Sequence, residues 1–100
     1  MVLSDINYDE GENTAKEIAK ETSTRVVFKK TDVTRKDDVE ALFELAIKEF
    51  GTVDIGINNA GIGGPFGPLE NISQEDYTKL IAVNLTGVFN CMQEELKIMK

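Results

Sequence analysis

The chain contains no histidine and no tryptophan, and Cys91 is its single cysteine. One cysteine cannot form a disulfide within the chain, and such sparing use of cysteine is typical of proteins in a reducing compartment. Without histidine, and with only one thiol, a transition-metal site has almost no ligands to draw on, so we expect no metal. Cys91 stands among apolar residues and is predicted to be a buried, unreactive thiol.

Long apolar runs and clusters of basic residues are also missing. No apolar stretch approaches the roughly 18 residues of a membrane span, and residues 1–4 are too short and uncharged for a signal peptide. The net charge of −7 argues against nucleic acid or a membrane surface as a partner. We therefore expect a soluble protein of the cytoplasm.

The chain instead shows strand and helix patterns in alternation. Strands are expected at 2–6, 24–30 and 53–57. Helices are expected at 10–21 and 74–99, and over the apolar stripe from Val39 to Phe50. Strands that alternate with helices pair in parallel, because each helix carries the chain back across the sheet. The prediction is therefore an α/β fold of three parallel strands alternating with three helices, β-α-β-α-β-α.

The ends of two helices have recognisable chemistry. Thr34 and Asp37 form a candidate capping pair before the second helix, and Ser73 and Asp76 form another before the third. Gly51 is expected to end the second helix in a left-handed conformation. The second helix also carries the clearest apolar stripe, at positions Val39, Leu42, Phe43, Ala46, Ile47 and Phe50.

A short apolar run at 53–57 is followed by Asn58, Asn59, Ala60 and Gly61. The run predicts a buried parallel strand, within which Gly56 is unusual because glycine offers no side chain to pack. The small residues predict a tight turn at its carboxyl end, the edge where open α/β sheets bind ligands. A plain turn is the alternative, because asparagine and glycine are common turn residues.

Residues 58–61 resemble the NNAG motif of the short-chain dehydrogenase/reductase family, NAD(P)-dependent oxidoreductases with a Rossmann fold. Three further features follow the family's order. They are Asp5 at the end of an opening strand, the pair Asp32 and Val33 after the second strand, and the run 83–89 on a long helix. The resemblance covers nearly the whole chain, which would then be a single partial NAD(P)-binding Rossmann domain over residues 1–100.

Two features of that family are not found in these residues. There is no TGxxxGxG turn, and no Tyr-x-x-x-Lys follows a catalytic serine, since Tyr8 is followed four residues later by Glu12 and Tyr77 by Ile81. The chain thus resembles an internal fragment of such an enzyme. In the family another strand stands between the first and third strands seen here, so we expect these two to pair directly in the fragment.

The resemblance implies a role for each candidate at the sheet edge. Asp5 would accept hydrogen bonds from the adenosine ribose diol and repel a 2′-phosphate, which favours NAD over NADP; the alternative is a solvent-facing carboxylate. Asp32 would accept from the adenine amine and Val33 would pack on its ring. Turn chemistry is the alternative for Asp32, and both roles can hold together.

The NNAG residues and Asn84 complete the implied set. Asn59, Ala60 and Gly61 would offer backbone contacts to the adenosine half, while the Asn58 side chain would tie the strand end to a neighbouring strand. Asn84 is expected to be a buried amide on an apolar helix face. The family's matching asparagine stabilises a break in this helix and holds a water in a proton relay, which makes Asn84 the catalytic candidate; a structural asparagine bonded to helix backbone is the alternative.

Two functions follow from these residues. The first is a fragment of an NAD-dependent oxidoreductase that transfers hydride between nicotinamide and an alcohol or ketone. It would retain the adenosine-binding half but not catalyse alone, because hydride transfer needs a proton donor that these residues lack. The second is a non-catalytic interaction fragment from a truncated gene, which would self-associate through the helix at 74–99.

Overall fold

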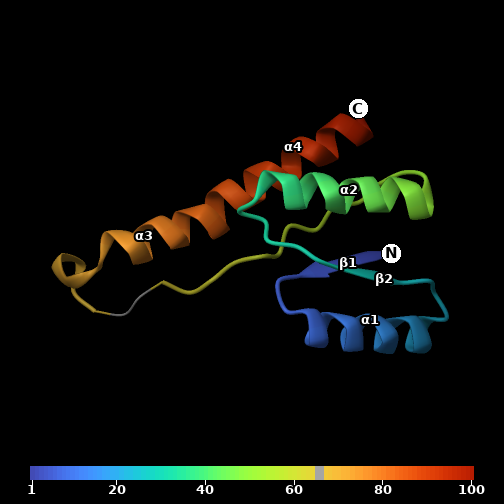
Figure 1. Cartoon of the computed structure of the whole chain (residues 1–100), viewed down its shortest axis with the longest axis horizontal. Coiled ribbons are helices and arrows are strands. Elements are labelled where there is room, and N and C mark those ends of the chain that lie inside the picture. The colour runs from blue at the N-terminus through green and yellow to red at the C-terminus, as the bar shows by residue number, and fades with distance from the viewer. Residues whose placement is uncertain (65–66) are drawn as a thin grey trace.

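The computed structural model describes residues 1–64 and 67–100. Its elements are β1 (Val2–Asp5), α1 (Tyr8–Thr22), β2 (Val27–Lys30), α2 (Lys36–Phe50), the 3₁₀ helix η1 (Leu69–Asn71), α3 (Gln74–Ile81), the π-helical η2 (Ala82–Thr86) and α4 (Gly87–Met99). The two strands pair in parallel, with Val2 opposite Val27 and Asp5 opposite Lys30. Helix α1 lies on one side of the strands, and α2 with α4 on the other (Figure 1). Within the described ranges, no helix is both long and apolar enough to cross a membrane.

Helix α1 packs closely on β2. It begins at Tyr8, two residues before the predicted start, because the Asn7 side chain caps it by accepting a hydrogen bond of 3.1 Å from the Glu10 N–H. Gly11 faces the buried ring of Phe28, and the Tyr8 ring meets that ring edge-on at 5.9 Å between centroids. The bare backbone of Gly11 is what allows the helix to approach the ring.

Helix α2 buries part of its predicted stripe, while Ile47 and Phe50 at its end are exposed, and its start differs from the prediction. Val39, Leu42 and Ala46 are buried, and Gly51 ends the helix at φ 84°, as predicted. The capping pair of Thr34 and Asp37 is wrong. The Thr34 hydroxyl instead donates to Asp32 Oδ1 over 2.6 Å, and the helix begins at Lys36 without a side-chain cap.

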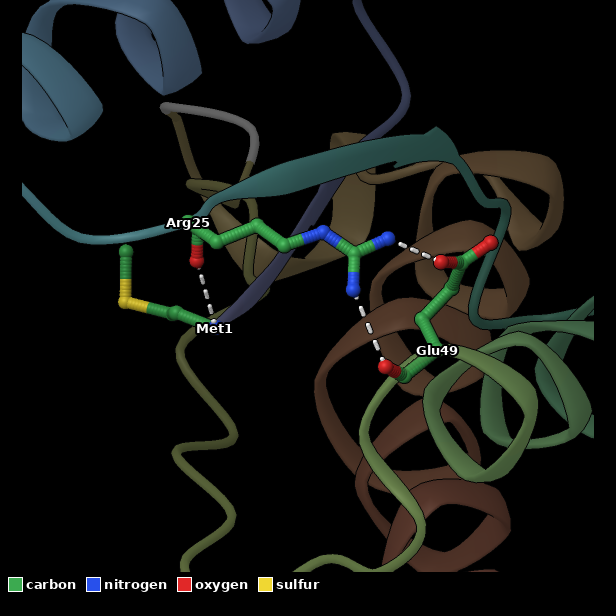
Figure 2. Close-up of polar contacts among 3 residues, drawn as sticks. All are labelled: Met1, Arg25 and Glu49. Atoms are coloured by element: carbon green, nitrogen blue, oxygen red, sulfur yellow. Dashed lines mark hydrogen bonds and ion pairs between the residues drawn. The ribbon is translucent and has the colours of Figure 1, made fainter.

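Arg25 joins the segment before β2 to the end of α2. Its guanidinium donates to the Glu49 carbonyl over 3.0 Å, forms an ion pair with the Glu49 carboxylate and lies 5.0 Å from the Phe50 ring centroid. The Met1 ammonium donates to the Arg25 carbonyl over 2.9 Å (Figure 2). An exposed ion pair contributes little to stability, so this cluster mainly sets how α2 lies beside the strands.

The predicted third strand at 53–57 is wrong, and so is its predicted pairing with β1. The described sheet contains only β1 and β2. The segment is an extended trace outside the sheet (Figure 1), and Ile55 and Ile57 are 81% and 85% exposed. An apolar run predicts burial, but a strand forms only when a hydrogen-bonded neighbour lies alongside it. Over residues 1–64 and 67–100 the fold is therefore α/β with two parallel strands.

The predicted helix at 74–99 is divided into α3, η2 and α4, so the described residues hold four α-helices where three helices were expected. Its start is as predicted, since the Asp76 N–H donates to Ser73 Oγ over 3.0 Å. The division is a π-helical turn at 82–86 centred on Asn84. Single π turns of this kind occur frequently at functional sites.

Cys91 is a buried thiol on α4, 7% exposed, as predicted. Burial and, to a smaller extent, the nearby Glu95 charge raise the pKa of this thiol above its ordinary value of 9.0. Alkylating reagents react with the thiolate form of cysteine. Because burial disfavours that form, Cys91 should resist alkylation in the folded chain.

We expect iodoacetamide at pH 8 to alkylate Cys91 at least about tenfold more slowly in the folded chain than in urea. Because the folded pKa is the higher one, the thiol's contribution to stability should be present below pH 9 and be lost as the pH rises above it. Mass spectrometry of timed samples measures the rates. Equal rates in the folded and urea-unfolded chain would contradict the burial of this side chain.

Candidate functional site

The carboxyl edge of the two-stranded sheet brings Asp5 and Asp32 into one region. Parallel strands end at the same edge, and here the Thr31 N–H donates to the Asp5 carbonyl over 2.9 Å, one residue before Asp32. The Asp5 side chain is exposed, and its Oδ1 accepts from the Asn7 N–H over 3.1 Å. A carboxylate can accept several hydrogen bonds, so Asp5 can accept further bonds from a ligand in addition to this one.

Asp32 forms the turn that leads into α2. Its Oδ1 accepts from the N–H of Thr34 over 3.0 Å and from the Thr34 hydroxyl, while its own N–H donates to Asp38 Oδ2 over 3.0 Å. The turn role considered for Asp32 is therefore present. It occupies one carboxylate oxygen and aligns the chain that carries Val33.

Val33 is held against α4. The buried Asn90 donates from Nδ2 to the Val33 carbonyl over 3.0 Å. A Cβ at Gly87 would lie 2.6 Å from Val33 Cγ2, so the valine side chain rests on bare helix backbone. These two contacts fix one side of Val33 and leave it half-buried at the sheet edge.

Asn84 binds the loop that follows the NNAG turn. Its Oδ1 accepts from the Ile62 N–H over 2.8 Å, and its Nδ2 donates to the Ile62 carbonyl over 2.9 Å. The prediction of a buried amide is wrong, because Asn84 is exposed and its partner is loop backbone rather than helix backbone. The helix break implied by the family resemblance is present, since Asn84 lies within η2.

The predicted partner of Asn58 is also wrong. Its Nδ2 donates over 3.2 Å to Oε2 of Glu95 on α4, not to a neighbouring strand. Gly56 lies against the same carboxylate, which explains why a glycine stands in an otherwise apolar run. Asn59, Ala60 and Gly61 lie between the Asn58 contact and the Ile62 contact, and all three are exposed.

Sequence reasoning missed three residues of α4 that hold these segments, namely Gly87, Asn90 and Glu95. All three are buried. With Cys91 they are the buried residues of this helix, whereas the large apolar residues Phe89, Met92 and Leu96 are exposed. The apolar pattern of the sequence therefore gave no signal for these three contacts.

The candidate residues fall into two groups that meet on one helix. Asp5, Asp32 and Val33 share the sheet edge, and Val33 rests on Gly87. The NNAG turn is tied through Ile62 to Asn84, three residues before Gly87, and residues three apart are neighbours on a helix surface. The turn and the sheet edge therefore dock about one helical turn apart.

The loop at 62–71 follows the NNAG turn. Its first described residues, Ile62 to Gly64, line a shallow hollow with Asp76 and Lys79 of α3. Residues 65–66 of this loop lie outside the described residues. In the described part of the chain, no three His, Cys, Asp or Glu side chains gather as a metal ion would require.

The family model described as short chain dehydrogenase matches residues 1–100. The chain belongs to the short-chain dehydrogenase family. A short chain dehydrogenase/reductase of Aspergillus oryzae, astE, is 34% identical over 99 residues, which are 99% of this chain and 38% of that protein. A 3beta-hydroxysteroid dehydrogenase of Mediterraneibacter gnavus is 40% identical over 73 residues, 73% of this chain and 26% of that protein.

Two solved structures have the same fold as nearly all of this chain. An alcohol dehydrogenase of Thermococcus sibiricus complexed with 5-hydroxy-NADP has a TM-score of 0.91 at 32% identity, covering 98% of this chain and 41% of that one. An NAD⁺-bound xylitol dehydrogenase has a TM-score of 0.93 at 26% identity, covering 98% and 37%. The short-chain dehydrogenase chain described here thus spans well under half the length of each of these relatives.

The Asn84 contact predicts a local effect of substitution. Asn84→Ala removes both hydrogen bonds to Ile62 and should lower the free energy of unfolding by about 1 kcal/mol, because water replaces part of what is lost at an exposed site. The exchange of the Ile62 amide hydrogen, measured by NMR, should become faster. Asn13→Ala, a change at an exposed asparagine of α1, is the control. An unchanged Ile62 exchange rate would show that the contact is not formed in solution.

Proposed function

We propose that residues 1–100 are a single partial domain that carries the adenosine-binding part of a nicotinamide dinucleotide site. The complete site would serve an oxidoreductase that transfers hydride between nicotinamide and an alcohol or ketone. Family membership supports the reaction class, and the solved relatives are complexes with NAD⁺ or an NADP derivative. The single observation that carries the proposal is the meeting of the sheet edge and the NNAG turn on η2 and α4.

Each candidate residue has a role in this proposal. The exposed Asp5 carboxylate accepts from the ribose hydroxyls, and Val33 presents an apolar surface to the adenine ring. Asp32 combines its turn role with acceptance from the adenine amine. Asn59, Ala60 and Gly61 are exposed and offer backbone contacts to the adenosine half, and the small side chains of Ala60 and Gly61 let the backbone approach it closely.

NAD is the proposed cofactor rather than NADP, because the Asp5 carboxylate would repel a 2′-phosphate. Lys30 is the register partner of Asp5 on the neighbouring strand, so a positive charge also stands near this position. The two charges act in opposite directions on a phosphate. The preference for NAD therefore depends on Asp5 being the closer of the two to the ribose.

The proposed catalytic contribution of Asn84 is indirect. Both polar atoms of its side chain are bonded to Ile62. A π turn shifts the helix hydrogen-bond pattern by one residue and can leave a carbonyl without an intrahelical partner. In our proposal a relay water binds to backbone of η2, and the Asn84 side chain fixes the loop beside it.

Titration of the chain with NAD, followed by NMR, tests the proposal. We expect millimolar or weaker affinity, competition by AMP and no competition by nicotinamide mononucleotide, since only the adenosine half is bound. Asp5→Asn should weaken NAD binding and reduce the preference for NAD over NADP. Asp9→Asn, on the exposed first turn of α1, is the matched control. Binding that nicotinamide mononucleotide displaces, or no binding at all, would overturn the proposal.

A second function, self-association through the helix at 74–99, is favoured by a specific pattern. Five apolar side chains repeat at spacings of four, three, four and three residues, the repeat of a helix-pairing seam. They are Leu85, Phe89, Met92, Leu96 and Met99, each between 42% and 63% exposed. We propose that this seam contacts a second copy of the chain.

Sedimentation velocity tests the seam. Phe89→Glu and Leu96→Glu should each shift the chain to a monomer, because a charge replaces an apolar side chain at the centre of the contact. Leu69→Glu changes an equally apolar and more exposed residue of η1 and should have no effect. An unaltered chain that remains monomeric at the highest attainable concentration would contradict this function.

A further inference from the structure

The carboxylate of Glu95 lies directly against the backbone of Gly56. A Cβ at residue 56 would stand 2.5 Å from Glu95 Cδ and Oε1 and 3.0 Å from Oε2. Real Cβ atoms do not approach other atoms so closely, so a side chain at 56 would have to displace this carboxylate. The glycine and the glutamate are therefore complementary.

Glu95 is only 9% exposed, and its Oε2 accepts from the Asn58 amide over 3.2 Å. A buried carboxylate is costly unless donors satisfy it. Asn58 supplies such a donor two residues after the glycine. The hydrogen bond between Asn58 and Glu95 joins the start of the NNAG turn to α4.

The opposite side of the turn is tied to the same helix system by Asn84 and Ile62. Asn84 and Glu95 are eleven residues apart, about three helical turns and about 16 Å along the axis. Asn58 and Ile62 are four residues apart, and four residues reach at most about 14 Å when extended. The segment 58–62 is thus anchored at both ends on this helix system and runs antiparallel to it.

We propose that Glu95 is a positioning residue that holds Asn59, Ala60 and Gly61 in place for the dinucleotide by anchoring Asn58. This inference rests on the proposed function for its consequence in binding. The positioning itself depends only on contacts within the chain. Glu95 touches no cofactor and acts through Asn58 and the bare backbone at Gly56.

The first measurement needs no ligand. NMR relaxation of the backbone nitrogens should give rigid order parameters for 59–61 in the unaltered chain and values below about 0.6 in Glu95→Ala. Glu95→Gln keeps a side chain of the same shape with an acceptor oxygen, so the order parameters of 59–61 should stay rigid. If Glu95 acted only through its negative charge, this neutral variant would be as mobile as Glu95→Ala. Asn58→Ala removes the same hydrogen bond from the other side and should reproduce the loosened turn. Glu94→Ala is the control, because Glu94 is the neighbouring carboxylate on the same helix and pairs with Lys97 rather than with Asn58.

The second measurement is NAD affinity in the same variants. Glu95→Ala should raise the dissociation constant about tenfold, the equivalent of one hydrogen bond, and Glu95→Gln should stay close to the unaltered chain. If the unaltered chain does not bind NAD, the proposed function fails, and the relaxation data alone decide the role of Glu95. Unchanged order parameters in a folded Glu95→Ala or Asn58→Ala chain would overturn the inference even if NAD binds.

Discussion

Gly11→Ala should lower the free energy of unfolding by about 2 kcal/mol, although alanine is the better helix former. An added Cβ would lie 2.0 Å from Phe28 Cε2 and 2.2 Å from Cζ, inside the buried contact between α1 and β2. Helix propensity favours alanine by about 1 kcal/mol. Forcing extra volume into a packed core costs about 1–3 kcal/mol or more, and here the ring is also confined by Tyr8. The steric term should therefore win, as measured by urea unfolding followed by circular dichroism.

Substitution of Phe28 tests whether its ring is the group that clashes with a methyl group added at residue 11. Phe28→Leu removes ring atoms that the new methyl would meet, so Gly11→Ala should cost less in that background than in the unaltered chain. Gly63→Ala is a control, since no atom lies within 4 Å of a Cβ built there. A Gly11→Ala chain that is more stable than the unaltered one would show that α1 does not pack on Phe28 as described.

Gly87→Val should displace Val33 from α4 and destabilise the chain by about 1–3 kcal/mol. A Cβ at this position meets Val33 Cγ2 at 2.6 Å and Val33 Cβ at 3.2 Å, and the Ala82 carbonyl oxygen stands at 3.4 Å. The clash falls where the sheet edge docks on the helix. Urea unfolding measures the stability, and the NMR signals of the Val33 methyl groups report the displacement.

The proposed site gives this variant a second consequence. If Val33 packs on adenine, Gly87→Val should weaken NAD binding more than Thr86→Val does, because Thr86 is an exposed neighbour on the same helix. In a Val33→Ala background the added side chain has fewer atoms to meet, and much of the lost stability should return. A Gly87→Val chain with unshifted Val33 signals would contradict the contact between Val33 and α4.

Features that depend on a few neighbouring residues were predicted well. The cap at Ser73, the left-handed end at Gly51 and the buried first part of the α2 stripe all follow from local hydrogen bonding and helical periodicity. The NNAG run and the residues in step with it were enough to indicate the family, which the family model supports across residues 1–100. The helix break at Asn84 was also anticipated through that resemblance.

Features that depend on a distant partner were not predicted. The segment at 53–57 has the composition of a strand but no strand beside it in the described residues. Asn58 found its partner 37 residues away, on a helix that sequence reasoning had treated as an apolar surface. Periodicity cannot foresee such contacts, because they depend on which elements meet.

The order of the first four elements, β1, α1, β2 and α2, follows from residues close together along the chain, since short-range backbone preferences and side-chain spacing decide it, and the family follows from short motifs. Which candidate residues share a site does not follow from the local sequence. Only the packing of α4 against both the sheet edge and the NNAG segment brings Val33 and Ile62 to neighbouring turns of one helix system. Gly56 and Gly87 allow these segments to approach α4 closely. Their role becomes visible only in the tertiary structure, where Glu95 and Val33 occupy the space that a side chain at 56 or 87 would need.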